Sequence, residues 1–211
     1  KFEFLNFKMK KIYFLWVTLF ISCDKDYLDI VPDNLATIDL AFNTRSTAEN
    51  FLATCYTYIP EHAHVEQNFS MIAGDEVWYY AENDFYMNNE TSFRVAKGMQ
   101  NKSEPYLNYW DGGRGAPHSL FTALRDCNIF ISRLKDVPGL DEEERLRWVD
   151  EVKVLKAFYH FWLMQMYGPI PIIDKNISVG AETEATYIKR ESIDSVVNYL
   201  TSLLDEVIDN E

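Results

Sequence analysis

Residues 148–173 read WVDEVKVLKAFYHFWLMQMYGPIPII, and no other part of the chain carries so clear a structural pattern. Its apolar residues recur at intervals of three and four, which places them on one face of a helix. Asp141, a little upstream, is the predicted N-cap, with Glu144 as its capping-box partner. Gly168 suits the left-handed residue just past a helix end, and Pro169 cannot continue a helix. We therefore expect one long helix that gives way to a short extended segment.

The same kind of spacing predicts further helices. Residues 117–135 and 193–207 each carry apolar residues at helical intervals. Residues 46–49, Ser-Thr-Ala-Glu, are typical of a capping box that begins an earlier helix, which Pro60 ends. A polar linker, residues 174–189, separates the long helix from the last one.

Two of these helices, residues 117–135 and 141–167, are joined by a short Pro-Gly turn and should lie antiparallel. With a third helix after them they look like helical-hairpin repeats, although no sequence repeat of about 34 residues can be recognised. We predict an all-α fold. The apolar stripe of residues 193–207 leads to the end of the chain, so we expect a C-terminally truncated portion of a longer protein. Without its C-terminal partners that stripe would be exposed, and the fragment alone should be poorly soluble.

Composition narrows the classes of partner. The chain has 211 residues, of which 47% are hydrophobic, enough for a substantial core in one or two domains. Its formal net charge of −13 makes nucleic acid and anionic bilayer surfaces poor electrostatic partners. Aromatic residues make up 15%, a high share for a helical protein, which indicates an aromatic surface facing a ligand or partner.

Residues 1–22 are predicted to be a signal peptide with upstream residues, and residues 23–211 the helical domain. A basic start leads into ten mostly apolar residues, 12–21, a secretory signal too short to span a bilayer. Ser22-Cys23 resembles a bacterial lipobox, so Cys23 is the predicted lipid anchor. The alternative is a cysteine that happens to follow a cleaved peptide. The acidic stretch directly after it resembles the tag that directs Bacteroidetes lipoproteins to the cell surface.

Two cysteines, Cys55 and Cys127, remain if Cys23 is acylated. Each falls within a predicted helix, and together they give no disulfide framework, so we expect two buried free thiols. Asn128 sits among apolar helix positions. It is predicted to be a buried hydrogen-bonding residue that fixes a helix or loop contact.

Other residue patterns that could carry chemistry are incomplete. His62 and His64 lack a metal-ligating partner at fixed spacing, so they are expected to be solvated loop histidines. Asp75 and Glu76 are adjacent, and a glycosidase pair cannot be inferred from one dipeptide. Residues 112–115 are Gly-Gly-Arg-Gly without the Lys and Ser/Thr of a phosphate loop, which indicates a turn. We predict no catalytic residue, metal site or cofactor.

Several segments together resemble the SusD/RagB family of nutrient-binding outer-membrane lipoproteins. The most specific part is the end of the long helix with its Gly-x-x-Pro exit. The segments are CDKDYLD (23–29), RDCN (125–128), EVKVLKAFYHF (151–161), YGPIP (167–171) and KRES (189–192). The resemblance implies a TPR-like helical scaffold, a longer parent protein, a TonB-dependent SusC-like transporter as partner, and oligosaccharide as the usual ligand.

A site for such a ligand needs flat aromatic platforms for the apolar faces of a sugar and polar side chains for its hydroxyls. Residues 61–116 have poor helical periodicity, and so long an irregular span is uncommon in a compact domain unless it serves binding. The alternative is that several of its aromatic side chains cover the helices as ordinary core. The candidate carbohydrate-binding residues are Trp78, Tyr79, Tyr80, Tyr86, Asn88, Arg94, Tyr109 and Trp110.

Three functional hypotheses follow. The first is a lipid-anchored, surface-exposed glycan-binding protein of the outer membrane that captures oligosaccharides and hands them to the transporter. The second is a helical-repeat module of an outer-membrane complex that binds a protein partner and no small ligand. The third is a hydrolase. We disfavour it because no acid/base pair or nucleophile can be recognised in the sequence.

Overall fold

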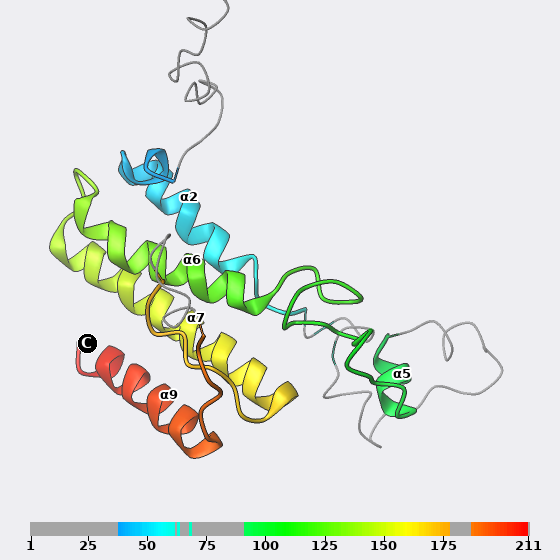
Figure 1. Cartoon of the computed structure of the whole chain (residues 1–211). Helices are drawn as coiled ribbons and strands as arrows, with labels where there is room; N and C mark the ends of the chain where they lie inside the picture. The colour runs from blue at the N-terminus through cyan, green and yellow to red at the C-terminus, as the bar shows by residue number, and fades with distance from the viewer. Residues whose placement is uncertain (1–37, 62, 64–67, 69–90, 178–186, 211) are drawn as a thin grey trace, which may run out of the picture. The chain divides into compact units, whose positions relative to one another are not determined.

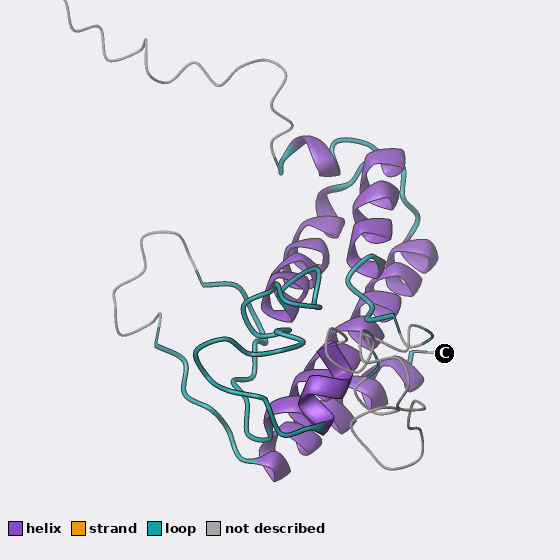
Figure 2. Ribbon diagram, turned by 90° about the vertical axis from the view of Figure 1, so that its right-hand side faces the viewer, coloured by secondary structure: helices purple, strands orange, loops and turns teal. Residues whose placement is uncertain are grey.

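The computed structural model describes residues 38–61, 63, 68, 91–177 and 187–210, all of which belong to one compact unit, Ile38–Glu211. Their secondary structure is helical apart from two isolated β-bridges, which confirms the all-α prediction (Figure 2). None of the described helices is long and apolar enough to cross a membrane. The elements in chain order are η2 (Leu40–Phe42), α2 (Arg45–Tyr56), α5 (Thr91–Ala96), α6 (Leu120–Arg133), η3 (Leu134–Asp136), α7 (Glu142–Tyr167) and α9 (Ile193–Ile208) (Figure 1).

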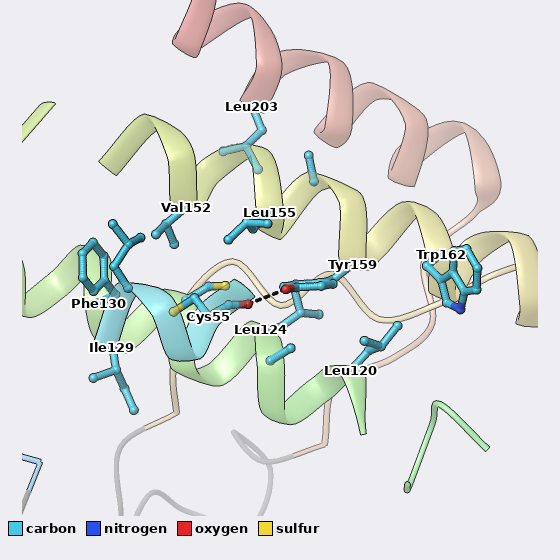
Figure 3. Packing of buried hydrophobic residues seen from close by; sticks show 14 of the residues in the cluster. Cys55, Leu120, Leu124, Ile129, Phe130, Val152, Leu155, Tyr159, Trp162 and Leu203 are labelled. Carbon is cyan, nitrogen blue, oxygen red and sulfur yellow. Dashed lines mark hydrogen bonds between the residues drawn. The ribbon is translucent and has the colours of Figure 1, made fainter. Parts of the chain in front are cut away.

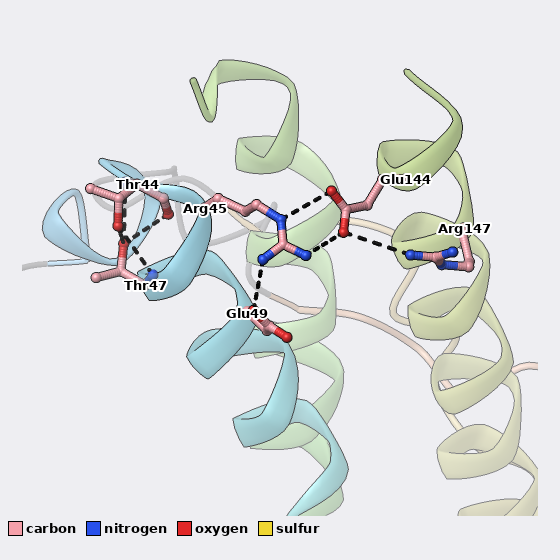
Figure 4. A network of polar contacts seen from close by, with 6 residues as sticks. All are labelled: Thr44, Arg45, Thr47, Glu49, Glu144 and Arg147. Carbon is pink, nitrogen blue, oxygen red and sulfur yellow. Dashed lines mark hydrogen bonds and ion pairs between the residues drawn. The ribbon is translucent and has the colours of Figure 1, made fainter. Parts of the chain in front are cut away.

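The long helix α7 begins as predicted. Asp141 has an extended backbone, and its carboxylate accepts a hydrogen bond from the Glu144 amide at 2.8 Å. The Glu144 carboxylate does not complete a capping box. It binds Arg45 at the start of α2 instead, accepting from Nε at 3.0 Å and from Nη2 at 2.5 Å (Figure 4). The bidentate pair therefore connects the first turns of two helices.

The end of α7 is set by Gly168. Its amide donates to the Met164 carbonyl at 2.9 Å, and its φ of 70° has the positive sign predicted for a left-handed residue. Its ψ of −125° lies outside the left-handed helical region, in backbone space that only glycine visits readily. The chain can therefore turn sharply into the extended segment that Pro169 and Pro171 favour.

The start of α2 differs from the prediction. A capping box is present, but it joins Thr44 and Thr47 and not the ends of residues 46–49: each hydroxyl accepts the other residue's amide at 3.2 Å (Figure 4). Thr44 has the extended backbone that an N-cap needs, so the helix begins at the residue that follows it. The helix also ends earlier, at Tyr56, and Pro60 lies beyond it.

Helices α6 and α7 form the predicted antiparallel hairpin, and α2 and α9 lie alongside them (Figure 1). Phe130 and Trp148 meet near the hairpin turn, with ring centroids 6.4 Å apart. On one side of α7, the Tyr159 hydroxyl donates to the Cys55 carbonyl of α2 (Figure 3). Cys55 and Cys127 are buried and free, as predicted.

Helix α9 packs against α7 in the opposite direction. In its first half, the Tyr199 ring lies 5.3 Å from that of His160, and near its end Glu206 pairs with Lys153 at 3.2 Å. The residues that α9 buries are Val196, Leu200 and Leu203. Their spacing of four and three is that of a helix seam against one neighbour.

Three side chains clamp the extended segment that leaves α7. Asn128 donates to the Ile173 carbonyl at 3.2 Å, which confirms its predicted role. His160 Nε2 accepts from the Ile173 amide at 3.0 Å. Lys156 Nζ donates to the Asp174 carbonyl at 2.6 Å and to its carboxylate at 3.2 Å. The exit segment is therefore fixed against α6 and α7 through its backbone.

Candidate functional site

The described residues of the predicted site are Arg94 in α5 and Tyr109 and Trp110 in the loop between α5 and α6. The predicted anchor and the other candidates lie outside the described residues: Cys23, Trp78, Tyr79, Tyr80, Tyr86 and Asn88. So do the four residues weighed for other chemistry: His62, His64, Asp75 and Glu76.

The loop before α6 is closed by its own hydrogen bonds. The Leu107 amide donates to the Arg114 carbonyl at 2.9 Å, and both residues adopt positive φ, near 50°. Asn108 accepts from the Asp111 amide at 3.1 Å and donates to the Gly112 carbonyl at 3.3 Å. Gly112 itself has a φ of 89°, a conformation that side chains rarely allow. The loop thus presents Trp110 from a fixed turn.

Arg94 contacts Tyr106, a residue that was not among the candidates predicted from the sequence. Its Nη1 donates to the Tyr106 hydroxyl at 2.9 Å. The Arg114 guanidinium lies 4.3 Å from the centre of the same ring and pairs with Glu104 at 2.8 Å. Tyr106 is buried between them. The cluster therefore ties α5 to the loop, and its exposed part is the Arg114–Glu104 pair.

Tyr109 lies in the core. Its side chain is 1% exposed and meets Trp162 of α7 edge to face, with ring centroids 5.8 Å apart. Burial raises the pKa of its hydroxyl to about 12. Because no ring face reaches the surface, a sugar cannot stack on Tyr109, and the site proposed below does not include it.

Trp110 is half-buried and is held from two helices. Its carbonyl accepts from the Ser119 hydroxyl, the N-cap of α6, at 2.5 Å. Its amide donates to the Tyr167 hydroxyl, in the last turn of α7, at 3.2 Å. The indole meets Phe121 at 4.8 Å and Tyr167 at 5.3 Å, both edge to face. The ring is therefore locked at the meeting point of the start of α6 and the end of α7.

Arg190 also contacts the Trp110 side chain. Its guanidinium carbon lies 4.4 Å from the centre of the indole ring, and its Nη1 donates to the Pro169 carbonyl at 3.1 Å. Both Arg190 and Asp111 are exposed. An aromatic plane, a guanidinium and a carboxylate thus share one part of the surface, which we call the Trp110 surface.

A sequence model of one protein family matches residues 26–209, and its description is starch-binding associating with the outer membrane. The chain belongs to the SusD-like family. No curated protein matches it in sequence. A SusD-like protein from Bacteroides fragilis has 18% identity and a TM-score of 0.61, with 80% of this chain and 30% of that one covered.

Two further solved structures show the same fold. A laminarin-binding SusD-like protein has 20% identity and a TM-score of 0.57, and a SusD superfamily protein from Bacteroides thetaiotaomicron has 15% and 0.54. Each match covers 80% of this chain but only 34% and 36% of the other. The fold is therefore the TPR-like helical fold of SusD-like proteins, and the chain spans about a third of the length of the structures it matches.

Arg190, like Asp111, is a residue of the Trp110 surface that was not predicted from the sequence. It lies in the KRES segment that resembles the SusD-like family, but nothing in that segment points to Trp110. The contact depends on the Gly168 turn and on the antiparallel bridge between Ile170 and Glu191, which returns the chain to the end of α7. Such a tertiary contact has no local sequence signal.

A cavity of about 470 Å³ with several charged residues in its lining lies elsewhere in this SusD-like chain, between α6, α7, α9 and the exit segment. Two of its three lysines form ion pairs: Lys156 with Asp174 at 3.2 Å and Lys153 with Glu206 at 3.2 Å. Burial lowers the pKa of Lys156, and the Asp174 contacts oppose that effect. These pairs hold the exit segment and α9 to α7, so we assign the cavity a structural role.

Proposed function

We propose that this SusD-like chain is part of a lipid-anchored protein of the cell surface that binds oligosaccharides and delivers them to a TonB-dependent SusC-like transporter. The observation that carries the proposal is the Trp110 surface. The half-buried indole, with the Arg190 guanidinium over its ring, would offer the apolar contact that a sugar face needs, and the exposed Arg190 and Asp111 would offer a donor and an acceptor for hydroxyls. The family description, starch-binding, supports the same ligand class.

Cys23, Trp78, Tyr79, Tyr80, Tyr86, Asn88 and Arg94 remain part of this proposal. Cys23 would carry the lipid, and the aromatic residues would extend the sugar platform beyond Trp110. Arg94 would act indirectly, because its bond to Tyr106 positions the loop that carries Trp110. The protein would act by binding alone, without a cofactor and without cleaving the glycan.

Retention of the full-length protein on a panel of immobilised polysaccharides tests this function. We expect at least one neutral polysaccharide to retain the wild type, and Trp110→Ala to weaken that retention about tenfold, because a stacked ring contributes on the order of 1 kcal/mol or more. Tyr56→Ala is the matched control, since Tyr56 is an exposed aromatic residue of α2. Equal retention of both variants, or no retention of the wild type, would count against the proposal.

The second candidate is a protein-interaction module without a small ligand. The exposed apolar residues of α7 and α9, among them Phe161, favour a packing partner. Under this alternative, Trp110→Ala leaves glycan uptake by cells intact, while the protein still co-purifies with an outer-membrane transporter. Under the oligosaccharide proposal, the same variant reduces uptake and leaves co-purification unchanged.

A further inference from the structure

Helices α7 and α9 form an apolar groove of about 260 Å³. Phe161 of α7 is 41% exposed and Leu204 of α9 is 38% exposed, so carbon surface from both helices faces solvent. The lining residues are Val154, Ala157, Phe158, Phe161, Leu200 and Leu204. A contiguous apolar groove of this kind marks a surface on which another element packs.

Helix α9 carries two apolar stripes side by side. The first consists of Val196, Leu200 and Leu203, which are buried against α7. The second is exposed, repeats at intervals of four, seven and four residues, and meets the groove at Leu204: Ile193, Val197, Leu204 and Ile208. A helix whose apolar face is this wide has neighbours on two sides. In the described part of the chain, α7 covers the first stripe.

The groove continues toward the start of α7. A second hollow of about 480 Å³ shares Val154 with it and contains Leu146 and Val207. Its charged lining is mostly acidic: Glu143, Asp150 and Glu151 against Arg147. From Leu146 to Phe161 the helix rises about 22 Å, the length of a helix of about 15 residues. One end of the groove is therefore acidic and the other end apolar.

We propose that the α7–α9 groove receives an amphipathic helix from the remainder of the longer SusD-like polypeptide. The matched SusD-like structures are about three times as long as the region that aligns with this chain, which covers 30% and 34% of two of them. Asn210 donates to Asp150 at 3.0 Å, so α9 ends at the acidic end of the groove. A helix that follows a short turn there would run antiparallel to α9.

The charge of the groove fits that direction. The N-terminus of a helix carries the positive end of its dipole, and Glu143, Asp150 and Glu151 would lie against it. We therefore expect the occupant to begin at the Leu146 end, with any basic residues near its first turn, and to place Leu-like side chains opposite Phe158 and Phe161. This packing does not depend on whether the Trp110 surface binds a glycan.

Site-directed photo-crosslinking in the full-length protein tests the proposal. A benzophenone-bearing phenylalanine analogue replaces Phe161, a conservative change that keeps an aromatic ring in the groove. The same analogue at Ala53, an exposed residue of α2, is the control. We expect mass spectrometry to find an intrachain link from position 161 to residues beyond 211, and no such link from position 53. A link between two copies, a link to another protein, or equal yields at both positions would overturn the proposal.

A stability measurement on the full-length protein is the second test. Leu204→Asp should lower the melting temperature by several degrees, because it buries a charge against the docked helix. Asn198→Asp, on the exposed polar side of the same helix, should leave it unchanged. Leu204→Ala shifts the temperature in the same direction if the aspartate variant does not fold. Equal melting temperatures for the wild type, Leu204→Ala and Asn198→Asp would contradict a covered groove.

Discussion

His160 is a neutral imidazole and is one of the three side chains, with Asn128 and Lys156, that hold the segment after α7 in place; we call these three residues the exit clamp. Its Nδ1–H donates to the Lys156 carbonyl at 2.8 Å, and its Nε2 accepts from the Ile173 amide at 3.0 Å. This assignment follows from the partners, because a carbonyl can only accept and an amide can only donate. Burial lowers the pKa of His160 from 6.5 to about 4. Protonation would place a charge in the core and break the bond to Ile173.

This geometry predicts a pH dependence of stability. Because the folded-state pKa lies below the unfolded one, the stabilising contribution of neutral His160 is complete above about pH 6.5 and is lost as the pH falls toward 4. The loss approaches roughly 3 kcal/mol. Urea unfolding of His160→Gln should show a flatter dependence over this range than the wild type. His118→Gln, which changes an exposed histidine, should keep the wild-type slope; equal slopes in all three proteins would contradict the clamp.

Replacement of Gly168 should also lower the free energy of unfolding. An added Cβ would meet no atom within 4 Å, so the cost is conformational and not steric. Gly168→Ala should lower the free energy of unfolding by about 1–3 kcal/mol, and Gly168→Asn should not restore it, because ψ lies outside the left-handed helical well that Asn tolerates. Chemical denaturation measures both variants. Full stability of the Asn variant would show that the turn relaxes into an ordinary helix cap.

At the scale of a single residue, the sequence predicted those positions whose roles are local. Asp141, Gly168 and Asn128 could be assigned because a cap, a turn and a polar residue among apolar ones each leave a pattern within a few positions. The burial of Tyr109 and the Arg190 contact with Trp110 left no such pattern. They depend on where α7 and the exit segment bring distant parts of the chain.

At the scale of the helices, periodicity predicted α6, α7 and α9 because 3.6-residue spacing directly reports a buried face. Helix ends were less certain where two cap residues compete. Thr44 and Ser46 can both accept an amide, and the sequence alone favoured Ser46 because Glu49 follows it at the capping-box interval. The structure selects Thr44, and Glu49 pairs with Arg45 at 3.1 Å instead.

This correction can be tested by two single substitutions. Thr44→Ala should lower the free energy of unfolding by about 1 kcal/mol, since it leaves the Thr47 amide without its cap. Ser46→Ala should be close to neutral, because Ser46 lies in the first turn and does not cap it. Both substitutions remove one hydroxyl group, and Thr44→Ala also removes a methyl group. A larger effect at Ser46 in equilibrium unfolding would place the start of α2 where the sequence suggested.

At the scale of the whole molecule, the proposed anchor makes a prediction of its own. Cys23→Ala in the full-length protein should abolish acylation and move the protein from the outer-membrane fraction to the soluble fraction. Metabolic labelling with a fatty-acid analogue and fractionation of cells measure both effects. Cys55→Ala is the control, because Cys55 is buried in α2 and should not be labelled. A labelled Cys23→Ala protein would rule out this anchor.

The net charge of −13 and the TPR-like scaffold are properties of the whole chain that suit a neutral ligand better than an anionic one. The family and the all-α class could be inferred from sequence because the helix-exit motif and the apolar spacing are both legible there. What covers the α7–α9 groove could not be inferred, because the exposed residues of α7 and α9 do not by themselves name an occupant.

Calorimetry of the full-length protein with an oligosaccharide prepared from the polysaccharide that retains it tests glycan binding at the Trp110 surface. We predict that Trp110→Ala raises Kd about tenfold or more and that Arg190→Ala raises it less, while both variants keep the wild-type far-ultraviolet circular dichroism. An unchanged Kd in Trp110→Ala, with the protein folded and the wild type binding, would show that the glycan binds elsewhere and would contradict the account.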